Sequence, residues 1–198
     1  MRQVSLALAL LFLAACAGIP PTSPGTADWE QHRARLEGLE NFTTTGKIAL
    51  KSPGQAESAS LLWRQTATNT HVQLSGPIGL AATSLDSDGE MLEIRQGEEY
   101  SRWQIDDPDL YRQAGWYLPL RALPHWIKGI PAPDLEIQKL LLDPETNLPL
   151  ELGQQDWTVH YHDFAQFGGF TLPTRLELSR DDSHARIILR QWKDFASQ

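Results

Sequence analysis

The sequence predicts a mainly β domain in which an antiparallel sheet is accompanied by a few short helices. Apolar and polar residues alternate along several segments, beginning at Phe42, and a period of two is typical of half-buried strands. Tight turns such as Ser52-Pro53-Gly54 and Asp88-Gly89 separate these segments, and short strands joined by such turns favour antiparallel pairing. The 198 residues are 41% hydrophobic, which is enough for one sizeable core.

Residues 1–15 are expected to be a signal segment. Arg2 precedes an apolar run from Val4 to Ala15, and this run is too short to span a bilayer as a helix. Leu13-Ala14-Ala15 then precedes Cys16, an order that resembles the lipobox of bacterial lipoproteins, in which the cysteine is acylated and begins the mature chain. A plain signal peptide with an incidental cysteine is the alternative. We interpret Cys16 as a lipid anchor.

The domain boundaries follow from the composition after Cys16. Residues 16–27 are rich in Pro, Gly, Ser and Thr, so they are expected to be a flexible linker between the lipid and a single domain at 28–198. A helix is predicted over about 28–40, with Asp28 as its cap and Trp29, Leu36 and Leu39 on one face.

Alternating apolar residues predict five strands before the middle of the chain and five after it. The first five contain Ile48 and Leu50, Leu61 and Trp63, Val72 and Leu74, Leu92 and Ile94, and Trp103 and Ile105. The later five contain Leu140 and Leu142, Leu148 to Leu152, Trp157 to Tyr161, Leu176 and Leu178, and Ile187 and Leu189. A sheet of this size can close on itself or curve around a cavity.

Two short helices are predicted between these groups of strands. The first begins at Asp107-Pro108 and ends near Gly115. The second contains Leu120, Leu123 and Trp126 and is stopped by Gly129. Helices inserted into a chain of strands need an apolar surface to cover, so we expect both to lie across the mouth or face of the sheet.

Charge and motifs exclude several classes of function. The net charge of −8 disfavours nucleic acid as a partner. The sequence contains no G-x-S-x-G, phosphate-binding glycine loop or H-E-x-x-H motif, so we expect neither an enzyme nor a cofactor. His160 and His162 share a strand face, but they lie opposite an apolar set and are expected to face solvent, so no metal site is predicted.

Two apolar features carry the functional interpretation. Seven tryptophans either fill the core or, arriving from both the sheet and its helices, line a groove. The segment Leu74 to Leu80 places Ile78 within a Gly-Pro-Ile-Gly turn. An aliphatic residue at the tip of a loop indicates membrane or partner contact if it is exposed, and the alternative is that Ile78 folds back onto the core.

These residues resemble the LolB family, whose members accept lipoproteins from the periplasmic carrier LolA and insert them into the outer membrane. The specific parts of the resemblance are Gly76 to Gly79 and the segment from Gly115-Trp116 to Pro131. The lipobox at Cys16, Trp29, Trp63, the segment 157–161, Leu172-Pro173 and Trp192 agree with it.

The resemblance implies an open, antiparallel β half-barrel with a short helical lid over a hydrophobic cavity that holds the acyl chains of a client lipoprotein. The family's protruding loop carries an aliphatic residue, usually leucine, that serves release into the membrane; here it corresponds to Ile78, between Pro77 and Gly79. The residues expected to line the cavity are Ile48, Leu50, Leu61, Trp63, Leu74, Leu92, Ile94, Trp103, Trp116, Leu120, Leu123, Trp126, Trp157 and Val159.

The expected protein is a monomeric receptor, anchored to the outer membrane through Cys16 and facing the periplasm, whose partners are a LolA-type carrier, lipoprotein acyl chains and membrane lipid. Ala17 in place of an aspartate after the anchor agrees with outer-membrane placement. Two alternatives are a LolA-like carrier, against which Cys16 argues, and a structural or partner-binding envelope lipoprotein whose core is filled by its own tryptophans.

Overall fold

The computed structural model describes residues 29–76, 82–105, 107–110 and 119–196. These residues form helix α1 (Trp29–Glu37), helix α3 (Leu123–Trp126) and eleven strands of one sheet. The strands are β1 (Asn41–Ser52), β2 (Gln55–Thr66), β3 (Asn69–Ser75), β4 (Thr83–Ser87), β5 (Met91–Gln96), β6 (Glu99–Gln104), β7 (Lys139–Leu142), β8 (Pro149–Gln154), β9 (Trp157–Phe167), β10 (Phe170–Arg180) and β11 (Ser183–Ala196).

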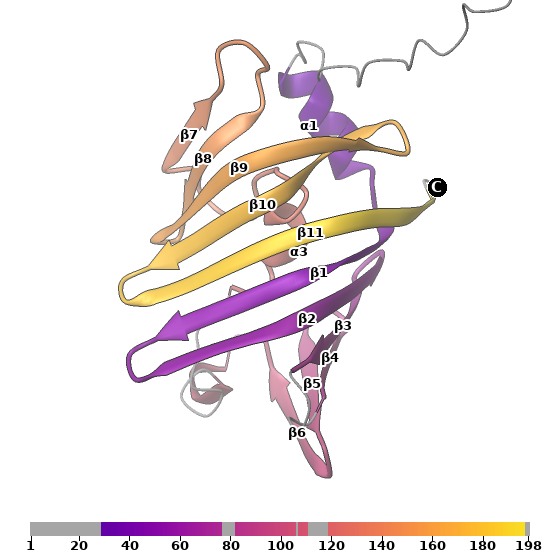
Figure 1. The fold of residues 1–198 in the computed structure, drawn as a ribbon, viewed down its shortest axis with the longest axis vertical. Coiled ribbons are helices and arrows are strands. Elements are labelled where there is room, and N and C mark those ends of the chain that lie inside the picture. Colours follow the sequence, from indigo (N-terminus) through magenta and orange to yellow (C-terminus); the bar gives the residue numbers. More distant parts are fainter. Residues whose placement is uncertain (1–28, 77–81, 106, 111–118, 197–198) are drawn as a thin grey trace, which may run out of the picture.

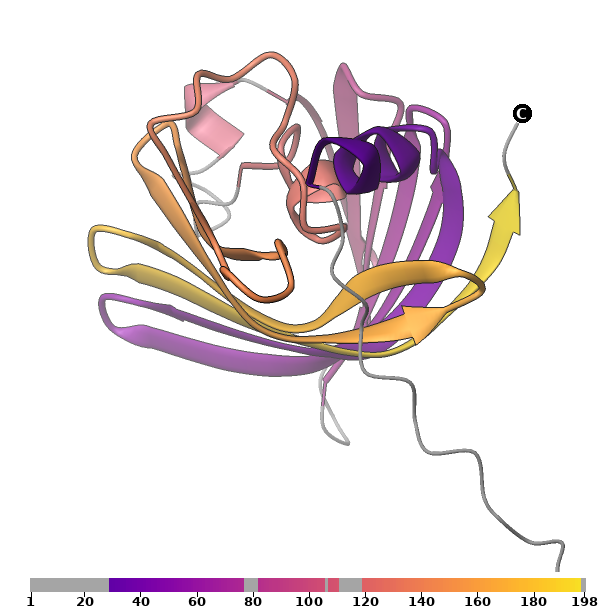
Figure 2. The same ribbon diagram turned by 90° about the horizontal axis from the view of Figure 1, so that it is seen from above.

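The sheet is antiparallel throughout and open. Its strand order is β6-β5-β4-β3-β2-β1-β11-β10-β9-β8-β7, so β1 and β11, from the two ends of the domain, pair at its centre. The edges β6 and β7 have no ladder between them in the described part of the chain. The sheet bends into a trough, and α1 and the segment around α3 lie on its concave side (Figures 1 and 2). The predicted open antiparallel half-barrel is confirmed.

The individual elements differ from prediction in a few places. Helix α1 ends at Glu37, three residues earlier than predicted, and Leu36 and Leu39 are buried as expected. Strand β4 was not predicted, because Leu85 is the single large apolar residue in Thr83–Ser87 and no alternation is visible. Residues 108–110 are helical, in agreement with the first lid helix, whereas the rest of that helix and Asp28 lie outside the described residues.

The core runs along the whole concave face. Strands on both sides of the β1–β11 junction contribute inward side chains, and the segment from Ala122 to Ala132 covers them, with Trp126, Ile127 and Ile130 fully buried. Complete burial of each large apolar side chain contributes about 1.5–3 kcal/mol to stability. No helix in the described residues is long and apolar enough to cross a membrane.

Candidate functional site

One half of the concave face encloses a cavity of about 450 Å³. Its wall comes from β1 to β5, with Ile187 of β11 and Leu39 from the end of α1. Six of the predicted residues on the strands line it: Ile48, Leu50, Leu61, Trp63, Leu74 and Leu92. Phe42, Val72 and Leu85 also line the cavity, although they were not predicted to do so. Val72 lies on the same strand face as Leu74, so the alternation along this strand could have predicted that Val72 lines the cavity.

The cavity is roofed by residues 119–129, which we call the lid. The carbonyl of Pro119 accepts hydrogen bonds from the amides of Ala122 (2.9 Å) and Leu123 (3.0 Å), and these bonds start the short helix α3. Leu120 and Leu123 of the lid, two of the residues predicted for an acyl-chain cavity, line this cavity. The lid ends at Gly129, which has a φ of +85°. Glycine adopts this backbone conformation readily, whereas residues with a Cβ do not.

Trp63 is fixed in the cavity wall by its polar edge. Its indole N–H donates to Oε1 of Gln65 at 3.1 Å, and the Thr70 hydroxyl donates to the same oxygen at 2.8 Å. The Gln65 amide donates in turn to the carbonyl of Ala67 at 2.8 Å. A buried indole N–H needs such a partner, and because this one has it, the apolar face of Trp63 can form part of the wall.

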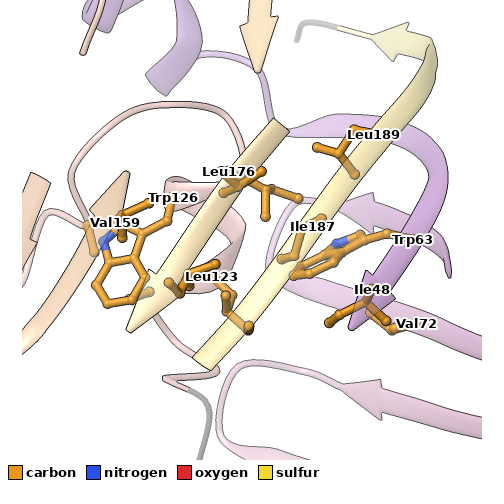
Figure 3. Close-up of a cluster of buried hydrophobic side chains, with 14 of the residues drawn as sticks. Ile48, Trp63, Val72, Leu123, Trp126, Val159, Leu176, Ile187 and Leu189 are labelled. Carbon is orange, nitrogen blue, oxygen red and sulfur yellow. The ribbon is translucent and has the colours of Figure 1, made fainter. Parts of the chain in front are cut away.

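The other half of the concave face is filled. Trp126 of the lid and Trp157 of β9 pack with ring centroids 6.3 Å apart, and both are almost completely buried together with Val159. Figure 3 shows Trp126 next to Val159, with Leu123 between this pair and the group formed by Trp63, Ile48 and Val72. The structure therefore places Trp126, Trp157 and Val159 in the packed core behind the lid, and not in the cavity lining where they were expected.

Gln154 of β8 holds this filled half together, and sequence reasoning missed it. The side chain is completely buried. Its Oε1 accepts from the Trp126 indole N–H (2.8 Å) and the Ala132 amide (2.9 Å). Its Nε2 donates to the carbonyls of Ala132 (3.0 Å) and Leu135 (2.8 Å). A glutamine beside a turn in the sequence carries no signal of this role, because all its partners lie far away along the chain.

The remaining predicted site residues are distributed as follows. Ile94 and Trp103 are half-buried and pack against the core cluster, outside the cavity lining. Trp116, the loop residues Pro77, Ile78 and Gly79, and Cys16 lie outside the described residues. His160 and His162 are exposed. No group of three His, Cys, Asp or Glu side chains in the described residues could hold a metal ion.

Two ionisable lid residues lie at the cavity. Nζ of Lys128 donates to the carbonyls of Leu36 (2.8 Å) and Leu39 (3.1 Å), at the end of α1. Burial lowers the pKa of Lys128 to about 8, although Glu37 and Glu40 partly oppose this shift. Burial, reinforced by the positive charge of Lys128, lowers the pKa of His125 to about 4. At neutral pH, Lys128 is therefore mainly charged and His125 is neutral.

A family model described as outer membrane lipoprotein LolB matches residues 40–192. The chain belongs to the LolB family. The outer-membrane lipoprotein LolB of Stutzerimonas stutzeri is 34% identical over 92% of this chain and 91% of its own length. LolB of Alkalilimnicola ehrlichii is 33% identical over 96% of each chain. The fold resembles that of a LolA superfamily protein from Nitrosomonas europaea, with a TM-score of 0.54, 12% identity, and 85% of this chain and 94% of the other covered.

Membership of this family agrees with the chemistry of the cavity. LolB proteins are outer-membrane lipoproteins that act as localisation factors for other lipoproteins, and the family implies interaction with lipoproteins and a LolA-type carrier. The cavity wall is dominated by Leu, Ile, Val and Trp side chains. A concave apolar site of this kind suits a hydrocarbon ligand.

Proposed function

We propose that this protein is an outer-membrane receptor that accepts lipoproteins from a LolA-type carrier, holds their acyl chains in the cavity between β1–β5 and the lid, and releases them into the outer membrane. The observation that carries the proposal is an apolar cavity of about 450 Å³ in a chain of the LolB family. Lipid chains in water are unfavourable by about 0.8 kcal/mol per exposed CH₂, so a shielded route across the periplasm is required.

The proposed transfer needs no covalent step and no nucleotide. A lipoprotein moves from carrier to receptor, and then to the membrane, if each acceptor binds the acyl chains with higher affinity than the one before. Residues 1–15 are the proposed signal segment, Cys16 the proposed lipid anchor and residues 16–27 the linker to a monomeric domain. An acylated Cys16 keeps the receptor beside the final acceptor, because two or more lipid chains anchor a protein durably.

The alternative, a structural envelope lipoprotein with a filled core, accounts for the half of the sheet beneath Trp126 and Trp157 but not for the cavity beside Trp63. A transfer assay separates the two. Residues 16–198 with Cys16→Ala contain every described element of the fold, so we would mix this protein with a LolA–lipoprotein complex and separate the two chains. We expect the lipoprotein to be recovered with this protein. Recovery solely with the carrier would contradict the proposed function.

Delivery is proposed to depend on the segment 77–81, which joins β3 to β4. By resemblance, Ile78 is the aliphatic residue that serves release into the membrane. Ile78→Glu is expected to leave acceptance of the lipoprotein intact but to prevent its transfer to lipid vesicles, because a carboxylate resists entry into the bilayer. Ile78→Leu, which keeps the apolar character, is the matched control and should deliver normally. Normal delivery by Ile78→Glu would remove this segment from the mechanism.

A further inference from the structure

The cavity wall changes from polar to apolar along the strands. Gln65 of β2 pairs with Thr70 of β3, and Thr70 pairs with Ser87 of β4, so these three residues form one row across the sheet. We call this row, all of which lines the cavity, the polar row. Residues paired across neighbouring strands point to the same face. The polar groups therefore gather at one level of the wall.

The next levels of the wall are apolar. Two residues along each strand from the polar row, the paired residues are Trp63, Val72 and Leu85. Two residues further along, they are Leu61, Leu74 and Thr83. Ile48 and Leu50 continue the apolar lining along β1, away from the polar row. At about 3.4 Å per residue, Leu50 lies roughly 27 Å along β1 from Phe42, the neighbour of Gln65. The cavity wall is thus amphipathic along its length.

The lid and α1 add further polar groups beside the polar row. Lys128 is tied to the end of α1 through the carbonyls of Leu36 and Leu39. Arg121 donates to the carbonyl of Gly89 (2.8 Å), in the turn that follows β4. Lys128, Arg121 and His125 all line the cavity. We call these three residues and the polar row together the polar end.

Hydrogen-bonding capacity remains at the polar end. A lysine ammonium has three donors, and two of those on Lys128 are occupied by backbone carbonyls. The Gln65 amide has two N–H groups, of which one donates to Ala67. Nδ1 of His125 is buried and has no hydrogen-bond partner among the described residues. A ligand with acceptor groups can bond to the remaining N–H groups of Lys128 and Gln65, and to Nδ1 of His125 in the tautomer that carries the proton there.

The charges at the polar end disfavour anionic acceptor groups. Glu37 and Glu40 lie near enough to Lys128 to raise its pKa, and Arg33 pairs with Glu37 at 3.6 Å, so exposed carboxylates already compensate the positive charge of Lys128. His125 adds no charge at neutral pH, because its pKa is lowered to about 4. An anionic group that enters beside Lys128 therefore loses its hydration without gaining an uncompensated cation in return, which is unfavourable.

We infer that the polar end receives the neutral ester and amide carbonyls that join the acyl chains of a lipoprotein to its peptide, with the chain ends directed toward Leu50 and Leu74. The same site discriminates against acyl lipids that carry an anionic head, and so keeps membrane phospholipids from competing for the cavity. This inference rests on the proposed function, since it assigns an orientation and a selectivity to the same cavity.

A pair of soluble lipids with identical chains tests the selectivity. Dioctanoylglycerol carries two ester carbonyls and no charge, and dioctanoylphosphatidic acid adds a phosphate to the same molecule. Binding to residues 16–198 with Cys16→Ala is measured at pH 7 by tryptophan fluorescence, because Trp63 forms part of the cavity wall. We expect the neutral lipid to bind at least about tenfold more tightly, a difference of about 1.4 kcal/mol.

Two variants identify the groups responsible. Glu37→Gln with Glu40→Gln, both at exposed positions, should raise the affinity for the phosphate lipid by a larger factor than that for dioctanoylglycerol. Lys128→Met should weaken binding of dioctanoylglycerol but not of dodecane, which has no polar group. Glu57→Gln with Glu145→Gln, at exposed positions outside the cavity lining, is the charge-matched control for the first variant.

The outcomes separate the inference from the proposed function. Equal binding of the two lipids by the wild type, or no response of the phosphate lipid to Glu37→Gln with Glu40→Gln, would overturn the inference while acyl binding itself stands. Failure of a folded protein to bind either lipid or dodecane would overturn both the inference and the proposed function.

Discussion

Replacing Gln154 with leucine is expected to destabilise the lid more than any exposed substitution of the same type. The change removes a hydrogen bond from four groups: the Trp126 indole N–H, the Ala132 amide and the carbonyls of Ala132 and Leu135. The Ala132 carbonyl still accepts from the Leu135 amide at 3.3 Å. The Leu135 bond is only part-buried, so water can replace it. Two orphaned groups at about 1–3 kcal/mol each and one lost bond at about 0.5–1.5 kcal/mol, partly offset by about 2 kcal/mol of apolar burial by leucine, lower the free energy of unfolding by about 0.5–5.5 kcal/mol.

The upper part of this range is large for a domain whose total stability is about 5–15 kcal/mol. Urea unfolding followed by tryptophan fluorescence measures the loss, and hydrogen exchange over residues 119–135 shows whether the lid opens before the sheet. Gln166→Leu is the matched control, because Gln166 is exposed and donates to the Thr171 hydroxyl; it should change stability by less than about 0.5 kcal/mol. A loss below about 0.5 kcal/mol for Gln154→Leu, no larger than that of the control and with unchanged exchange, would refute the reasoning.

Three further perturbations address the lid. Tyr161→Phe removes the bond from the buried Tyr161 hydroxyl to the carbonyl of Trp126; since that carbonyl still accepts from Gly129, urea unfolding should show a loss of only about 0.5–1.5 kcal/mol. Gly129→Ala should destabilise by about 1–2 kcal/mol, because a left-handed residue gains a Cβ that would lie 3.2 Å from Pro173. Gly38→Ala, with its nearest contact at 3.7 Å, is its control, and equal losses would contradict the argument. Stability should fall as the pH drops from about 6.5 to about 4, because the unfolded chain binds a proton at His125 more tightly than the folded chain does. The free energy of unfolding measured across that range should depend less on pH in His125→Gln than in the wild type. Part of the pH dependence should remain in the variant, because the pKa of His32 is also lowered. An identical dependence on pH in the variant and the wild type would exclude His125 as its source.

The strands were predictable because their signal is local. Alternation in segments such as Phe42 to Leu50 reflects which side chains point inward, and this depends on the two-residue period of each strand alone. The exception is β4, where a strand with one large apolar residue is recruited by pairing with β3 and β5. The end of the lid at Gly129 was likewise readable, since a glycine after an apolar helical pattern is a stop signal.

The sequence by itself determined the antiparallel strands, the helical segment between the two groups of strands and the set of apolar residues from which a cavity could be built, and the family resemblance implied that the sheet is open. Only the tertiary structure decided which tryptophans line the cavity and which fill the core, because the lid packs Trp126 against Trp157 and turns Leu123 toward the space beside Trp63. The polar row likewise exists only through strand register, which brings Gln65, Thr70 and Ser87 to one level of the wall. Each of these contacts joins residues that are separated along the chain, and their positions are set by packing that no local pattern encodes.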